Sequence, residues 1–286
     1  MADLRNSLTS IELPDPPQGW FECRHALLSD GSLALIRVNR DFGRDRGSFN
    51  WRTSRLRLSS FSYGVESPAI EVDGCIWPNV CRLSDGSWLV AAARAREGEA
   101  NARLFDQFGA ALGAFAMGDG LEHVICTAKG ATWVGYFDES ERAARLLALD
   151  AHGDRTWALT GEPYVLDCYA LSVTGETAWA CTYPDFPILR IENGKLSSWA
   201  NVEIAGARAI VAKGDHVILA GGYEPDKSRV ALLKLGARTA QLVASIEWPA
   251  IAEPSAFVGG RDGVLHVVVG GRWRQLAIYD WLEVLR

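Results

Sequence analysis

Residues 79–91 read NVCRLSDGSWLVA: an apolar stretch, a polar turn that contains a glycine, and a second apolar stretch. A glycine placed after short polar residues supplies the positive φ that a tight hairpin turn requires. The same order of features recurs as HALLSDGSLALI at residues 25–36, HVICTAKGATWVGY at 123–136, CYALSVTGETAWACTY at 168–183, ARAIVAKGDHVILAGG at 207–222 and SAFVGGRDGVLHVVVGG at 255–271. Each copy therefore predicts a β-hairpin.

The hairpins repeat with a period that indicates one architecture. Their turn glycines are 39 to 55 residues apart, at Gly31, Gly86, Gly130, Gly175, Gly214 and Gly263. A second hairpin follows in most copies, with turns at Gly109, Gly153, Gly194 and Gly236. Two hairpins make four strands, and a period of about 40–45 residues is that of a propeller blade. The sequence predicts an all-β fold: a single six-bladed β-propeller of four-stranded antiparallel blades over residues 1–286.

The two ends of the chain complete this prediction. The last copy leaves little room for a full outer strand at residues 283–286, whereas residues 8–13 (LTSIEL) alternate in polarity before the proline-rich turn at 14–17. We therefore expect residues 1–20 to form a closing segment that supplies the outer strand of the last blade. Helix signals are almost absent.

Composition excludes several classes of protein. The net charge of −6 argues against general nucleic-acid binding, and no apolar run reaches the roughly 20 residues that span a membrane. Residues 37–57 are the exception in charge, with seven arginines, two aspartates and the aromatic residues Phe42, Phe49 and Trp51. Such a segment could bind anions, but a solvated hairpin between two strands is the favoured interpretation.

The termini and cysteines indicate the compartment. Residues 1–10 (MADLRNSLTS) lack the apolar stretch of a secretory signal, and the six cysteines include no C-x-x-C pair. Most of these cysteines lie in apolar strand-like runs, where a free thiol behaves as a small core residue. A reduced, cytoplasmic protein is expected.

Beyond the repeat, the chain resembles the six-bladed β-propeller group that includes the NHL-, YWTD- and lactonase-type propellers. It is similar to uncharacterised bacterial propeller proteins that share GDG-x-EH, here at residues 118–123, and WVGYFDE, here at 133–139. The resemblance covers roughly residues 76–222 and implies the fold without implying an activity.

Candidate site residues follow from blade geometry. The innermost strand of each blade lines the central channel, and loops at one mouth form the usual binding site. Counting back from the turn glycines, and adding the loops after the second strands, gives a polar and aromatic set that we predict to bind a ligand: Asn79, Glu122, His123, Tyr136, Asp138, Asp167, Tyr169, Tyr183, Asp185 and Arg208.

A more specific prediction is that part of this set binds a divalent metal ion such as calcium. Asn79, Glu122 and Asp167 offer the oxygen ligands that hard cations prefer, and lactonase-type propellers use a similar set. Alternatively, these groups satisfy Arg24, Arg208 and main-chain amides. His123 beside Glu122 could act as a general base. No complete catalytic motif is present, so catalytic residues are not assigned.

Two functions remain open. The first is a binding module that recognises a small polar ligand, a peptide or a partner protein at the channel mouth. The second is a metal-dependent hydrolase of the lactonase type. The repeat scaffold with variable polar loops favours the first, although a fold by itself does not decide function. Neither nucleic acid nor a membrane is expected as a partner.

Overall fold

A computed structural model describes residues 8–41, 53–140 and 144–286. The chain divides into two compact units. The N-terminal unit comprises residues 14–143 and 147–156, and the C-terminal unit comprises residues 1–13, 144–146 and 157–286.

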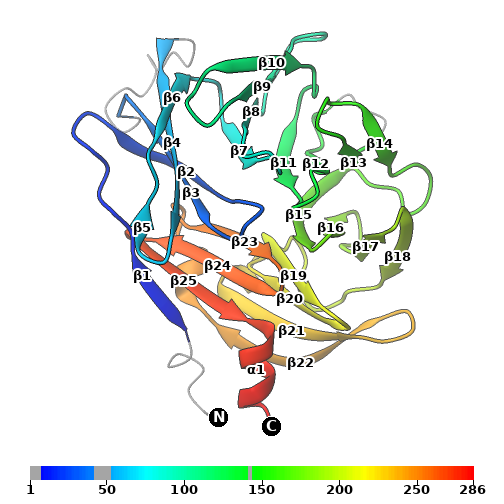
Figure 1. Cartoon of the computed structure of the whole chain (residues 1–286). Coiled ribbons are helices and arrows are strands. Elements are labelled where there is room, and N and C mark those ends of the chain that lie inside the picture. Colours follow the sequence, from blue (N-terminus) through cyan, green and yellow to red (C-terminus); the bar gives the residue numbers. More distant parts are fainter. Residues whose placement is uncertain (1–7, 42–52, 141–143) are drawn as a thin grey trace. The chain divides into compact units, whose positions relative to one another are not determined.

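Three antiparallel sheets are built mainly from the N-terminal unit (Figure 1). The first contains β2 (Phe21–Leu27), β3 (Leu33–Val38), β4 (Arg55–Ser62), β5 (Val65–Glu66) and β6 (Ile70–Asp73), and both β5 and β6 pair with β4. The second contains β7 (Pro78–Arg82), β8 (Trp88–Ala92), β9 (Ala102–Phe105) and β10 (Ala111–Phe115). The third contains β11 (Leu121–Cys126), β12 (Thr132–Tyr136), β13 (Leu146–Leu149) and β14 (Arg155–Ala158).

The C-terminal unit holds three further antiparallel groups. The first contains β15 (Asp167–Thr174), β16 (Thr177–Tyr183), β17 (Ile188–Glu192) and β18 (Lys195–Trp199). The second contains β19 (Ala209–Lys213), β20 (His216–Ala220), β21 (Arg229–Leu235) and β22 (Ala240–Glu247). The third contains β23 (Phe257–Arg261), β24 (Val264–Val269), β25 (Arg272–Ala277) and β1 (Thr9–Glu12). A single parallel residue pair, Val173 with Arg261, joins the first and third groups into one eight-stranded sheet. Two short 3-10 helices, η3 (Asp226–Ser228) and η4 (Pro249–Ala252), lie between strands.

The hairpins lie where the repeat predicted them. All six first-turn glycines, from Gly31 to Gly263, have positive φ between 57° and 94°. Each of these turns joins the first two strands of a group, as β7 pairs with β8 around Gly86. The turn residues therefore account for the hairpins, because L-residues adopt this conformation only at a cost.

The N-terminal strand also lies where it was predicted. β1 pairs antiparallel with β25, from Thr9 with Gln275 to Glu12 with Arg272, and the Leu13 amide donates to the Gly271 carbonyl at 2.8 Å. It is the outer strand of the β23–β25 group, and in Figure 1 it runs beside β25.

The end of the chain differs from the prediction. Residues Ile278–Val284 form a helix, α1, directly after β25. Ile278 and Trp281 are both 1% exposed and pack into the core of the C-terminal unit. Their spacing of three residues matches one helical turn, but a segment this short gives little periodicity to detect. Among the described residues, no helix has the length and hydropathy to cross a membrane.

Apolar faces of adjacent sheets form the cores. In the N-terminal unit, Ile36 and Leu58 of the first sheet pack with Val80 and Trp88 of the second. Trp88, Trp133 and Trp179 follow their turn glycines and are 3–6% exposed. The recurring tryptophans therefore pack in the interior, as large aromatic side chains usually do.

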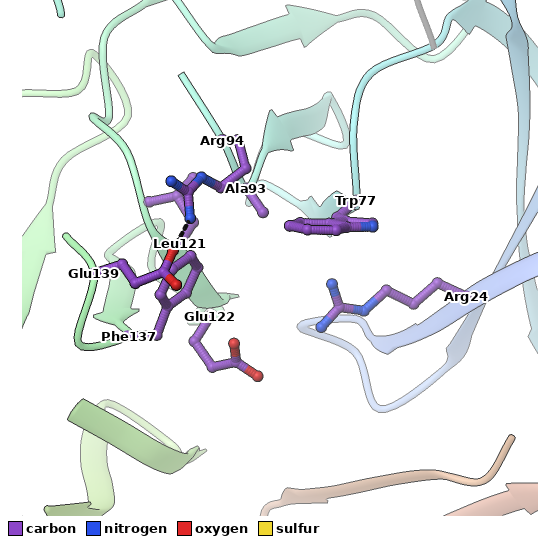
Figure 2. A pocket seen from close by; sticks show the side chains of 8 residues that line it. All are labelled: Arg24, Trp77, Ala93, Arg94, Leu121, Glu122, Phe137 and Glu139. Atoms are coloured by element: carbon purple, nitrogen blue, oxygen red, sulfur yellow. Dashed lines mark hydrogen bonds and ion pairs between the residues drawn. The ribbon is translucent and has the colours of Figure 1, made fainter. Parts of the chain in front are cut away.

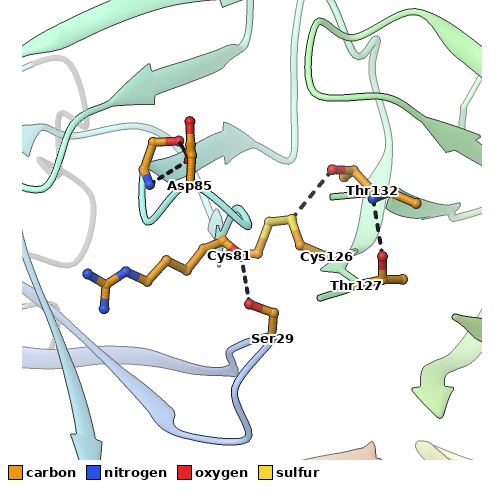
Figure 3. Close-up of a disulfide and its surroundings, with 9 residues drawn as sticks. Ser29, Cys81, Asp85, Cys126, Thr127 and Thr132 are labelled. Carbon is orange, nitrogen blue, oxygen red and sulfur yellow. Dashed lines mark hydrogen bonds between the residues drawn. A yellow bond between two sulfur atoms is a disulfide. The ribbon is translucent and has the colours of Figure 1, made fainter. Parts of the chain in front are cut away.

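One cysteine pair departs from the expectation of free thiols. A disulfide joins Cys81 of β7 to Cys126 of β11, with their Cα atoms 6.0 Å apart (Figure 3). The two residues are 45 positions apart, about one repeat, so neighbouring sheets bring them together although no local motif links them. Cys23, Cys75, Cys168 and Cys181 form no disulfide.

The arginine-rich segment is only partly a solvated hairpin. Arg37, at its start, is fully buried on β3, and its guanidinium lies 2.6 Å from Glu66 and 3.1 Å from the Pro14 carbonyl oxygen. Arg55, on β4, is 47% exposed in its side chain. Phe42, Phe49 and Trp51 fall outside the described residues.

A buried histidine predicts a pH-dependent stability. His266 on β24 is 3% exposed, accepts a hydrogen bond from the Trp273 indole at 3.1 Å, and is neutral because burial, with the charge of Arg261, lowers its pKa to about 3. The unfolded chain binds a proton on this residue below pH ~6.5 and the folded chain does not, so stability falls as pH drops through this range.

We expect unfolding measurements at acid pH to reveal the contribution of His266 to the pH dependence of stability. Between pH 6 and pH 4, the wild type should lose about 1.4 kcal/mol more per pH unit than His266→Gln, measured by urea unfolding at each pH. Parallel slopes for the two proteins would contradict this assignment.

Candidate functional site

A pocket in the N-terminal unit is lined by residues from its three sheets and the adjoining loops (Figure 2). Its volume is about 390 Å³, which is enough for a small organic ligand. Strands β2 and β11 contribute side chains, as do the residues just before β7 and just after β8 and β12. The lining consists of Arg24, Trp77, Ala93, Arg94, Leu121, Glu122, Phe137 and Glu139.

A β-bulge orients Glu122. Leu121 pairs with Tyr136 and His123 pairs with Gly135, so Glu122 is an extra residue in β11. A similar irregularity lies in β2 between Glu22 and Arg24. Bulges redirect side chains and are frequent beside binding sites, and here they occur where β2 and β11 reach the pocket.

Main-chain contacts fix the rim of the pocket. The Ala93 carbonyl accepts hydrogen bonds from the amides of Gly120 and Leu121 at 2.9 and 3.0 Å. Asp119 accepts one from the Ala95 amide at 2.8 Å. Gly120 has a φ of +79°, and a Cβ there would lie 2.7 Å from that of Ser140. The GDG sequence at residues 118–120 is therefore a tight loop that holds the start of β11 against the end of β8.

One charged network forms a wall of the pocket. Arg94 donates to Glu139 at 2.5 Å, lies 3.1 Å from Asp119, and places its guanidinium 5.2 Å from the centre of the Phe137 ring. The hydrogen bond to Glu139 is the main cause of a raised pKa for Arg94. This arginine is thus held as a cation with its charge compensated by two carboxylates.

Trp77 contributes an exposed aromatic surface in an unfavourable backbone conformation. Trp77 is 54% exposed and its φ is +44°. A residue that precedes proline, as Trp77 precedes Pro78, normally adopts an extended conformation, so this φ is doubly unusual. Strain of this kind costs about 1–3 kcal/mol and persists most often at functional sites.

Two substitutions of Trp77 measure the backbone strain at this position. Trp77→Gly should be about 1 kcal/mol more stable than Trp77→Ala, because glycine adopts a positive φ without a steric cost. Chemical denaturation of both variants measures this difference. Equal stabilities, or a more stable alanine variant, would show that the backbone at this position is not strained.

The structure places the predicted residues of the N-terminal unit in different environments. Glu122 lines the pocket. Asn79 is 7% exposed and donates to the Leu121 carbonyl at 3.4 Å, and Tyr136 is fully buried with its hydroxyl on the Met117 carbonyl at 2.7 Å. His123 follows Glu122 on β11, and Asp138 is exposed in the turn after β12. Asn79 and Tyr136 thus bind main-chain carbonyls, and Glu122 is the member of this group that lines the pocket.

The predicted residues of the C-terminal unit surround an aromatic cluster. Tyr169 packs edge-on against Phe186 and Tyr223, with ring centres 5.4 and 5.8 Å apart, and its hydroxyl contacts that of Tyr223. Tyr183 is 41% exposed at the edge of this cluster, and Asp185 has a φ of +65°. Asp167 begins β15, opposite Tyr183.

Arg208 is bound by main-chain carbonyl groups. Its guanidinium donates to the carbonyl oxygens of Ile251 and Ala256 at 2.6 and 3.0 Å. Burial lowers its pKa. These hydrogen bonds satisfy the guanidinium with main-chain carbonyl oxygens.

The described residues do not provide a cluster of donor side chains for the predicted metal ion. Among the described residues, no group of three or more His, Cys, Asp or Glu side chains is arranged to hold a metal ion. The amide of Asn79 is engaged with the main chain, and Glu122 and Asp167 belong to different units. The set of Asn79, Glu122 and Asp167 stays a prediction.

Several lining residues were not in the predicted set. Trp77 lies one residue before the positions counted as strand starts, and Arg94 lies in the loop after β8, which was not included among the second-strand loops. The two motifs quoted for the resemblance did contain a signal: residues 118–123 and 133–139 together include Leu121, Glu122, Phe137 and Glu139.

Comparison with known proteins identifies the fold. No family model and no curated protein matches the chain. Solved structures do match. A virginiamycin B lyase from Staphylococcus aureus has a TM-score of 0.57 at 10% identity, over 95% of this chain and 99% of that one. The β-propeller domain of Cps50 (Swd1) from Myceliophteria thermophila has a TM-score of 0.52 at 12% identity, over 93% and 99%.

A chain of a mitotic checkpoint complex is also similar, with a TM-score of 0.56 at 8% identity, over 93% of this chain and 79% of that one. Identities this low show a shared fold alone. The protein therefore has a β-propeller fold.

Proposed function

We propose that the protein is a six-bladed β-propeller that acts as a binding module, with the pocket of the N-terminal unit as its ligand site. Six antiparallel strand groups support six blades, and β1 supplies the outer strand of the last group. The likeness to solved propellers supports the same architecture.

The strained, exposed Trp77 beside the pocket carries the functional proposal. Backbone strain and solvent exposure of a large aromatic ring both lower stability, and at Trp77 the two coincide with a pocket, so a contact with a ligand explains why this ring is held there. The pocket is mostly preformed, because main-chain hydrogen bonds fix its rim and the network of Arg94 fixes one wall. No observation specifically favours the metal-dependent hydrolase.

A thermal-shift screen of a small-metabolite collection tests this proposal. At least one compound should raise the Tm of the wild type, because a ligand at 100 times its Kd adds about 2.7 kcal/mol of stability. The same compound should have little effect on Trp77→Ala and an undiminished effect on Tyr63→Ala. Tyr63 is the matched control, since it is 98% exposed with a φ of +50° in the same unit and does not line the pocket.

Two outcomes would overturn the proposal. One is that no compound stabilises the wild type. The other is that every stabilising compound acts equally on Trp77→Ala, which would place its site elsewhere.

A further inference from the structure

The charges of the pocket are not all compensated. Arg94 has two carboxylate partners, Asp119 and Glu139. Arg24 and Glu122, in contrast, form no ion pair and no side-chain hydrogen bond within the described residues. The pocket thus presents one cation and one anion whose hydrogen-bonding capacity is available to a ligand.

These two groups occupy different strands of different sheets. Arg24 extends from β2 and Glu122 from β11, and Figure 2 shows both side chains pointing into the cavity, which the Trp77 ring also lines. Both residues are half-buried, so a ligand would meet them with part of their hydration removed. Hydrogen bonds to ionised groups contribute more than neutral ones under these conditions.

The remaining surface of the pocket is apolar. Ala93, Leu121, Phe137 and the indole of Trp77 line it. A molecule bound between Arg24 and Glu122 would therefore place an apolar portion against these side chains, as aromatic surfaces favour. The cavity of about 390 Å³ accommodates a molecule of the size of an amino acid or a dipeptide.

We infer that the ligand is a small zwitterion, an amino acid or short peptide, whose carboxylate binds Arg24, whose ammonium group binds Glu122, and whose apolar side chain packs on Trp77. This inference rests on the proposed function and specifies its ligand class. A guanidinium binds a carboxylate through paired donors, and a carboxylate accepts from an ammonium group. A purely anionic ligand would leave Glu122 unpaired, and a purely cationic one would leave Arg24 unpaired.

Three related compounds test each charge separately. L-phenylalanine carries both charges, N-acetyl-L-phenylalanine lacks the ammonium group, and L-phenylalaninamide lacks the carboxylate. Calorimetric titration of the full chain should give a Kd for L-phenylalanine about 10–100-fold lower than for either analogue, since hydrogen bonds to charged groups contribute about 1.5–3 kcal/mol.

Variants assign each charge to its residue. Arg24→Met should remove the preference for L-phenylalanine over the amide, and Glu122→Gln should remove the preference over the N-acetyl compound. Arg96→Met and Glu97→Gln are matched controls, because both residues are exposed and do not line the pocket, and both variants should keep the wild-type preferences.

Two results overturn the inference and leave the proposed function in place. The first is that the three compounds bind equally in a Trp77-dependent manner. The second is that none of them binds although other metabolites stabilise the wild type through Trp77. Failure of every metabolite would overturn the proposed function itself, so the two failures are distinguishable.

Discussion

Arg37→Met is expected to lower the free energy of unfolding by about 3–5 kcal/mol, because it leaves a carboxylate without its buried partner. The Arg37 side chain is fully buried and lies 2.6 Å from Glu66, which also accepts a hydrogen bond from Ser59 at 2.6 Å. The Pro14 carbonyl would lose a donor as well. Denaturant unfolding measures the change.

Two comparison variants make this prediction specific. Arg55→Met removes one member of an exposed pair with Asp73, 3.4 Å away, and should cost at most about 1 kcal/mol. The double variant Arg37→Met/Glu66→Met should recover part of the loss, because it removes both charges together. A loss for Arg37→Met no larger than that for Arg55→Met would contradict the buried pair.

Gly260→Ala is expected to destabilise the protein by at least about 3 kcal/mol, at or above the usual cost of overpacking. A Cβ at Gly260 on β23 would collide with the main-chain oxygen of Ile210 on β19 and lie 2.7 Å from Cγ2 of Val211. Ile210 is fully buried and pairs with Leu219, so its main chain has little room to move. Strands β19 and β23 therefore approach each other so closely that only glycine fits at position 260.

Gly270→Ala provides the control for this prediction. Gly270 has a φ of +57° and no atom within 4 Å of an added Cβ, so its substitution should cost only about 1 kcal/mol of conformational strain. Equal losses for Gly260→Ala and Gly270→Ala would show that the close approach of β19 and β23 does not constrain the fold.

The strands could be predicted from the sequence because the hairpin turns are local. A glycine at a fixed place in each copy, such as Gly86 between β7 and β8, sets both the turn and the strands beside it. Pairing of β1 with β25 could be predicted because an alternating segment and a missing outer strand lie at opposite ends of the chain. The disulfide depends on contact between β7 and β11, which no local pattern encodes.

The site was predictable only in part, for a physical reason. Counting along a strand locates Glu122 near the end of β11, but the bulge that makes it an extra residue depends on how β11 pairs with β12. The φ of Trp77 depends equally on its surroundings, since its position before Pro78 predicts an extended conformation. The polarity of Asn79 and Arg208 predicts contacts with a ligand, whereas in the structure both bind main-chain carbonyls.

A crystallographic fragment screen of the full chain tests the central claim most directly, because it locates bound molecules without assuming their chemistry. The account predicts that fragments gather in the pocket lined by Arg24, Trp77 and Glu122, and that fragments carrying both a carboxylate and an amine place these groups on Arg24 and Glu122. An empty pocket, with fragments bound only elsewhere, would contradict the claim that this pocket is the ligand site.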